Sequence, residues 1–193
     1  MITAFILVIK NFFLLIFFPY KTMRKIEREK DYYQLGIIFL LVFIYFKFIY
    51  FLRNNPYPAT FVFIIFLINF LLTTGFFYLV SKNSGKVNFK SFVFTFSYSL
   101  FPTLIWFICN SILYVLLPPP RTLSFLGKGF SIFFVAFSLS LLAWKLILVY
   151  LSLRFSSRLG IYRILYMIFL YMIWFIPCTI FLYHFKLFRV PFI

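Results

Sequence analysis

The chain has 193 residues, of which 65% are hydrophobic, and its mean hydropathy is +1.06. A water-soluble domain is about half apolar, whereas this chain contains apolar stretches of about twenty residues, each long enough to cross about 30 Å of hydrocarbon. Its 19 Lys and Arg against 3 acids would favour nucleic acid in a soluble protein. Here they form short clusters between apolar stretches, which excludes that class and is typical of the loops of a membrane protein.

The first segment, residues 1–19, is apolar apart from Lys10 and Asn11. It has neither a positively charged start nor a small-residue cleavage site, so we do not expect a removable signal peptide. The segment can either cross the membrane or lie in its interface, and we favour an interfacial or half-inserted helix. Together with residues 20–33, the most polar part of the chain, it forms a lead over residues 1–33.

Residues 20–33 contain all three acids of the protein. The helical spacing of Lys25 with Glu29, and of Glu27 with Lys30, predicts a surface helix supported by weak ion pairs. One interpretation is a solvated helix beside the membrane. The other is a docking surface for a partner, because no other segment carries negative charge. The candidate docking residues are Arg24, Glu27, Arg28, Glu29 and Asp31.

Five apolar stretches then predict five membrane-spanning helices. They cover residues 35–52, 59–80, 91–117, 130–151 and 164–183. The predicted fold class is all-α, a polytopic transmembrane helix bundle with about five spans and an N-terminal interfacial helix. Residues 1–193 form a single membrane domain, and we find no internal repeat of the kind that many secondary transporters contain.

Small and polar residues in the second and third predicted spans indicate close contacts between helices. Pro102 removes a backbone donor from the third span, so we expect a kink there, with residues 97–99 facing other helices. The candidate contact residues are Asn69, Thr73, Gly75, Tyr98, Ser99, Pro102 and Trp144. Lys47 and Lys145 also lie within spans, where each either extends to the headgroups or pairs with an anionic substrate.

Most Lys and Arg residues outside the spans fall on the side of the lead and of the second and fourth loops. The positive-inside rule therefore places the N-terminal basic region in the cytoplasm and the C-terminus outside. The bias towards Phe, Ile, Lys and Asn favours a bacterial source, and hence the inner membrane.

The titratable residues offer little for catalysis. The three carboxylates lie together before the first span, and the one histidine, His184, lies near the tail. Cys109 and Cys178 lie in apolar spans and lack the spacing of a metal site. We therefore predict no enzymatic activity, no cofactor and no metal.

Short motifs follow one another in an order that matches the predicted spans. They are Phe17-Phe18-Pro19-Tyr20, Gly85-Lys86-Val87-Asn88-Phe89-Lys90, Phe96-Ser97-Tyr98-Ser99-Leu100-Phe101-Pro102 and Leu141-Leu142-Ala143-Trp144-Lys145-Leu146. In this order the chain resembles the Yip1 family of five-span membrane proteins, particularly its short bacterial members. The most specific matches are the Tyr-Ser-Leu-Phe-Pro sequence and the tryptophan late in the fourth span.

The resemblance implies a cytoplasmic N-terminus and a C-terminus on the opposite side, and it supplies no catalytic residues. Eukaryotic relatives act in vesicle trafficking through a long N-terminal region that residues 1–33 do not resemble, so that role is not carried over. Some bacterial relatives look like accessory proteins of exporters. We therefore expect a non-catalytic scaffold or accessory subunit of a membrane transport or export complex.

The expected partners are another integral membrane protein or a second copy of this chain, together with anionic lipid headgroups on the cytoplasmic side, and no nucleic acid. The alternative is an autonomous transporter or lipid-handling protein. Its polar path would be lined by Asn69, Thr73, Thr74, Tyr98, Asn110 and Ser111.

Overall fold

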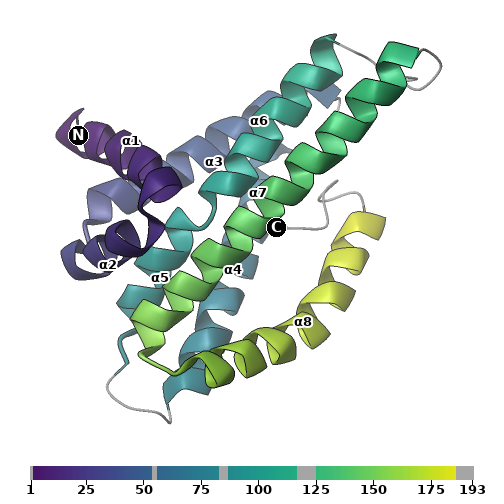
Figure 1. Ribbon diagram of the computed structural model, residues 1–193. Coiled ribbons are helices and arrows are strands. Elements are labelled where there is room, and N and C mark those ends of the chain that lie inside the picture. Colours follow the sequence, from purple (N-terminus) through teal and green to yellow (C-terminus); the bar gives the residue numbers. More distant parts are fainter. Residues whose placement is uncertain (1, 54–55, 83–86, 117–124, 186–193) are drawn as a thin grey trace.

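The structure is a computed structural model that describes residues 2–53, 56–82, 87–116 and 125–185 (Figure 1). Across these residues all regular secondary structure is helical, which confirms the predicted all-α fold. The helices are α1 (Ile2–Phe17), α2 (Pro19–Glu29), α3 (Tyr32–Arg53), α4 (Ala59–Lys82), α5 (Phe89–Tyr98), α6 (Phe101–Leu116), α7 (Phe125–Ser157) and α8 (Ile161–His184).

Five segments are long and apolar enough to cross a membrane, which confirms an integral membrane protein with five candidate spans. α3, α4, α7 and α8 each supply one span, and α5 and α6 together supply the third. α7 is longer than the predicted span at residues 130–151. It ends where Arg158 adopts a left-handed conformation with φ of 57°, and Gly160 then caps the start of α8.

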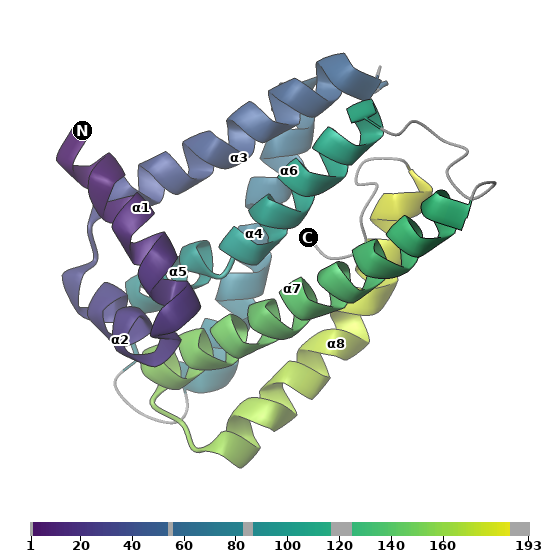
Figure 2. The same ribbon diagram turned by 45° about the horizontal axis from the view of Figure 1, so that its top comes forward.

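α1 and α2 lie together at one end of the bundle, where α1 crosses α3 at a steep angle in both views (Figures 1 and 2). α1 has 16 residues, about 24 Å at 1.5 Å per residue, and is shorter than the hydrocarbon layer. Its inner face is buried at Ala4, Val8, Asn11 and Leu15. Its outer face exposes Phe5, Ile6, Ile9 and Phe13. This division gives a helix with one side in the bundle and the other available to lipid.

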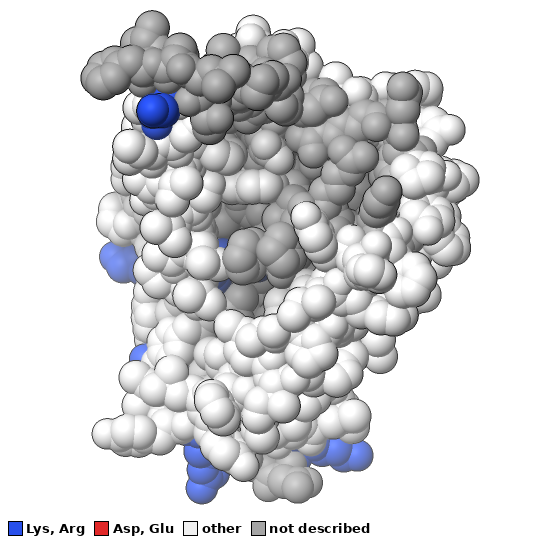
Figure 3. All heavy atoms as spheres, turned by 90° about the vertical axis from the view of Figure 1, so that its right-hand side faces the viewer, with Lys and Arg blue, Asp and Glu red and all other residues white. Residues whose placement is uncertain are grey.

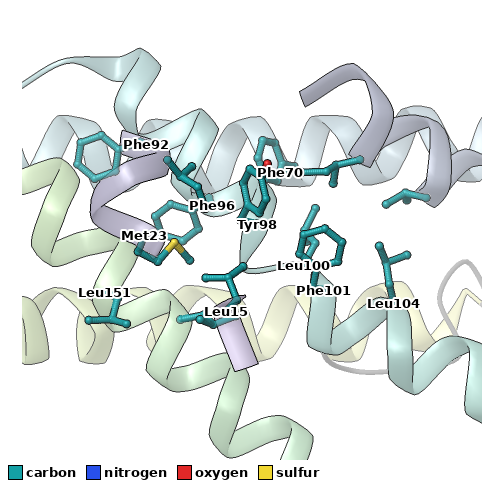
Figure 4. Close-up of a cluster of buried hydrophobic side chains, with 14 of the residues drawn as sticks. Leu15, Met23, Phe70, Phe92, Phe96, Tyr98, Leu100, Phe101, Leu104 and Leu151 are labelled. Carbon is teal, nitrogen blue, oxygen red and sulfur yellow. The ribbon is translucent and has the colours of Figure 1, made fainter. Parts of the chain in front are cut away.

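α5 lies at the centre of the bundle and contacts α2, α3, α4 and α7. In the most apolar 18-residue window of the α5–α6 span, 72% of the residues are buried, against 33% or less in the other four spans. Phe92, Phe96 and Tyr98 of α5 are buried in the cluster of apolar side chains shown in Figure 4. Phe77 of α4 stacks on Phe96, with ring centroids 5.3 Å apart.

Short hydroxyl side chains bring α5 close to its neighbours. Thr95 Oγ1 lies 2.9 Å from Ser156 Oγ of α7, and Ser152 Oγ donates to the carbonyl oxygen of Thr95 at 3.1 Å. Towards α2, Ser91 Oγ donates to Glu27 Oε1 at 3.2 Å. Small hydroxyl residues allow helix backbones to approach, and they supply hydrogen bonds between helices where lipid offers none.

A buried polar network joins α1, α3 and α5. Asn11 Nδ2 donates to Gln34 Oε1 at 3.1 Å and to Tyr98 Oη at 3.2 Å, and the Tyr98 hydroxyl also donates to Gln34. Gln34 Nε2 in turn donates to Asp31 Oδ2 at 3.1 Å. Because buried polar groups are costly without partners, these bonds select the position in which α1 crosses the bundle.

The third predicted span, residues 91–117, is two helices rather than one kinked helix. α5 ends at Tyr98, and α6 begins at Phe101 with Pro102 as its second residue. Proline is tolerated in the first turn of a helix, where its missing donor is not required, but it cannot continue the turn before it. The N–H of Leu100 donates to the carbonyl of Ser97, three residues back, which closes α5 with a tight turn.

Gln34→Leu should destabilise the protein more than Tyr98→Phe. The first change removes the group that both Asn11 and Tyr98 contact, and we expect a loss of about 1–3 kcal/mol in the free energy of unfolding. Tyr98→Phe leaves the Asn11–Gln34 bond in place, and we expect the free energy of unfolding to fall by about 1 kcal/mol or less. Thermal unfolding in detergent measures both. Tyr33→Phe, at an exposed side chain beside the network, is the control; a wild-type melting temperature for Gln34→Leu would contradict the structural role.

Pro102→Ala should allow α5 and α6 to join. We expect a longer distance between spin labels at residues 90 and 115, towards the roughly 38 Å of a straight helix, together with a lower melting temperature. Electron–electron distance measurement on a background lacking Cys109 and Cys178 tests this. Pro177→Ala is the matched control, because α8 continues through Pro177. An unchanged distance would mean that packing, and not Pro102, divides the span.

Candidate functional site

The acids of α2 take part in the two predicted ion pairs. Lys25 Nζ lies 3.5 Å from Glu29 Oε1, and Lys30 Nζ lies 3.7 Å from Glu27 Oε1. Glu27 also accepts the hydrogen bond from Ser91 of α5. The carboxylate of Glu27 therefore holds α2 against the bundle, whereas that of Glu29 is exposed.

Asp31 contacts the start of α3. Its carboxylate accepts the backbone N–H of Tyr33 at 2.9 Å and the side-chain amide of Gln34 at 3.1 Å, as a capping residue does. Arg24 and Arg28 are exposed. Of the five candidate docking residues, Glu27 thus contacts α5 and Asp31 contacts α3, whereas Glu29 pairs with Lys25 of its own helix. Arg24, Arg28 and Glu29 line an open groove, of about 370 Å³, whose walls also include Lys21 and Lys25.

The candidate residues for contacts between helices lie in different parts of the bundle. Tyr98, Ser99 and Pro102 are buried at the junction of α5 and α6. Asn69 and Thr73 lie on α4, where both line a cavity inside the bundle. Ser99 lines the same cavity, whereas Pro102 lines another cavity, between α6 and α7.

Thr73 joins α4 to α8, because its Oγ1 lies 2.8 Å from Tyr171 Oη. Trp144 of α7 is half-buried and packs edge-on to Phe12 of α1, with ring centroids 6.4 Å apart. Gly75 differs from the other candidates: a Cβ added there would meet nothing within 4 Å. It does not mark a close approach of two helices in this structure.

The cavity lies between α4, α5, α7 and α8 and has a volume of about 220 Å³; we call it the inner cavity. Its wall is mainly aromatic and aliphatic. The polar residues among those that line it are Asn69, Thr73, Ser99, Lys145 and Tyr171. Figure 3 looks onto the side of α7 and α8 and shows a hollow with Lys or Arg atoms inside it. No Asp or Glu atom is visible there among the residues that the structure describes.

Lys145 lines both the inner cavity and a second one. The second cavity, of about 260 Å³, lies between α6 and α7, and Leu142 is also common to both. Trp106 of α6 lines the second cavity, and its Nε1 donates to Ser138 Oγ of α7 at 2.9 Å. Lys145 is half-buried, whereas the other lysine predicted within a span, Lys47, is exposed near the end of α3.

The six residues of the alternative polar path do not gather around one cavity. Asn69 and Thr73 line the inner cavity. The others line neither of the two cavities: Thr74, Tyr98, Asn110 and Ser111. Thr74 and Ser111 donate their hydroxyls to carbonyls of their own helices, which is how such groups are satisfied within a membrane.

Three important residues were not identified as such from sequence. Asn11 is conspicuous as an amide in an apolar segment, but nothing in the pattern pairs it with Gln34. Lys145 is open to two interpretations, extension to the headgroups or contact with an anion. The structure adds that Lys145 lines two cavities, which the sequence does not indicate.

Within the described ranges, no three His, Cys, Asp or Glu side chains lie close enough to hold a metal ion. No protein-family model matches this chain, and neither a curated protein nor a solved structure matches it. The resemblance to the Yip1 family therefore rests on its short motifs and stays a prediction. What the fold establishes is an integral membrane protein with five candidate spans.

Proposed function

We propose that the protein is a non-catalytic scaffold or accessory subunit of a membrane complex, such as a transport or export system. The observation that supports this most is the exposure of α7. In the most apolar window of the span Gly127–Ser157, 6% of the residues are buried within the chain, the lowest share of the five spans. Over this window α7 packs little against its own chain and leaves much of its surface for lipid or for another helix, whereas its C-terminal part, with Ser152 and Ser156, is buried.

The exposed surface of α7 contains a row of small residues, which we call the small-residue face. Its members are Gly129, Ala136, Ser140 and Ala143, and all four are exposed. Their intervals of seven, four and three residues place them on one side of the helix. Small residues at such spacing allow two membrane helices to approach closely. The face therefore favours a helix of another membrane protein, or of a second copy, as its neighbour.

α2 offers a second contact at the membrane surface. Its buried residues Thr22, Met23 and Ile26 hold it on the bundle, and Arg24 and Arg28 remain exposed. Basic side chains beside a leaflet attract anionic headgroups by about 1 kcal/mol each. The same side chains suit an acidic loop of a partner.

The resemblance to the Yip1 family supports the same role, since some bacterial relatives look like accessory proteins of exporters. In this proposal the protein lies in a bacterial inner membrane. The basic lead faces the cytoplasm and the C-terminus faces outward, in agreement with the distribution of Lys and Arg.

An autonomous transporter is the second candidate, and the inner cavity is the observation that favours it. Two features weigh against it. Only two of the six path residues line that cavity. In addition, all three acids of the chain precede the first span, so no carboxylate within a span is available for coupling to protons or sodium.

The proposed orientation predicts which loops react with a membrane-impermeant thiol reagent in intact cells. On a background lacking Cys109 and Cys178, Pro56→Cys, after α3, should be labelled from outside. Arg158→Cys, between α7 and α8, should be labelled only after the membrane is opened. Labelling of residue 158 from outside would reverse the orientation.

Bulk added to the small-residue face should weaken the complex. For the double variant Ala136→Leu and Ala143→Leu, we expect a loss of about tenfold or more in recovered partner, because overpacking costs about 1–3 kcal/mol. Purification in mild detergent at native abundance, followed by quantitative mass spectrometry, measures how much of a different partner protein is recovered. Size-exclusion chromatography measures self-association.

Val115→Phe is the matched control, since it adds comparable bulk at an exposed position on α6. It should leave recovery of the partner unchanged. Equal recovery with the double variant and with wild type would exclude the small-residue face as the interface. A monomer with no enriched partner that moves a solute after reconstitution would favour the transporter.

A further inference from the structure

Lys145 places a positive charge in the interior of a membrane span. It lies nine residues before Arg154, about 14 Å at 1.5 Å per residue, and twenty residues after Phe125 at the start of α7. A lysine side chain is much shorter than this distance, so extension to the headgroups near Arg154 does not account for its position. Ionisable residues at such depth are costly and mark sites for ions or ligands.

The wall beside Lys145 is suited to a hydrocarbon chain. Phe70, Phe96 and Phe175 contribute aromatic surface to the inner cavity, and Leu142 and Val149 contribute aliphatic surface. A cavity of roughly 150 Å³ holds a benzene ring of six carbons, so the volume of about 220 Å³ has room for the head and the first part of an alkyl chain. The site therefore combines an apolar wall with one cationic group.

We propose that the inner cavity binds the head end of a long-chain fatty acid, with its carboxylate at Lys145 and the adjoining part of its hydrocarbon chain along the phenylalanine-rich wall. An ammonium group and a carboxylate form a charge-assisted hydrogen bond, which is strongest away from water. Asn69 and Tyr171 are further polar residues in the wall of the same cavity. This binding goes beyond the scaffold role and does not depend on it.

The depth of Lys145 favours a fatty acid over a phospholipid. The head of a fatty acid is a single carboxylate, which fits a site in the interior of a span. A phosphodiester head carries a glycerol and a polar substituent, and these groups remain at the level of the headgroups. The neutral methyl ester of the same chain has the hydrocarbon but lacks the charge, so it isolates the contribution of Lys145.

The test is fluorescence quenching of the full chain in non-ionic detergent by dibrominated stearate. Bromine quenches tryptophan at short range, and Trp174 of α8 packs against Tyr171, which lines the inner cavity, with ring centroids 6.3 Å apart. We expect saturable quenching, with the acid binding about tenfold or more tightly than its methyl ester, as one charge-assisted contact provides. Trp174→Phe should remove most of the signal, whereas Trp106→Phe, in the second cavity, should leave most of it.

Lys145→Met should abolish the preference for the acid over the ester, and Lys145→Arg should retain it. Lys47→Met is the matched control, because it removes an exposed lysine from another span and should change nothing. Leu142→Phe narrows the space without altering the charge, and should weaken acid and ester alike. Far-ultraviolet circular dichroism and the melting temperature establish that each variant is folded.

Equal affinity of the wild-type protein for acid and ester would overturn the proposal. So would a Lys145→Met variant that keeps the preference for the acid. Tighter binding of dibrominated phosphatidylglycerol than of the acid would overturn the assignment of the head as a carboxylate. If Lys145→Met does not fold, the comparison of acid with ester on the wild type and on Leu142→Phe still decides the outcome.

Discussion

Close packing around α5 is the constraint on which the rest of the bundle depends. Lipid tails are as apolar as phenylalanine or leucine, so apolar burial between spans contributes little, and helices associate through tight contact and hydrogen bonds. α5 supplies both. Ser91 and Thr95 form short contacts to α2 and α7, and Tyr98 joins the network with Asn11 and Gln34.

The two halves of α7 consequently have different surroundings. Its C-terminal half packs on α5 through Ser152 and Ser156, both buried. Its N-terminal half extends past the end of α5 and exposes residues such as Ile132 and Phe133. Lys145 lies between these halves, where the cavities on either side of α7 meet its side chain. One helix thus carries a structural contact, a cationic site and a free surface.

Among the five candidate spans, α8 packs least against the other described helices. Thr73 to Tyr171 is one hydrogen bond between α4 and α8, and Ser81 Oγ lies 3.8 Å from Met167 Sδ at another point along the same pair. In Figure 1, α7 and α8 diverge from the loop that joins them. The inner cavity lies between them and the central helices.

The sequence by itself determined the number of spans, the lead and its two ion pairs, because apolar length and helical spacing are local properties. It also located the break at Pro102. That the break separates two helices, α5 and α6, is seen only from the turn in which the N–H of Leu100 donates to the carbonyl of Ser97. Only the tertiary structure decided that Asn11 meets Gln34 and Tyr98, that a Cβ at Gly75 would contact no neighbouring helix, and that Lys145 lines two cavities. These facts depend on which faces of distant helices meet, and in lipid no hydrophobic pattern distinguishes a buried face from an exposed one.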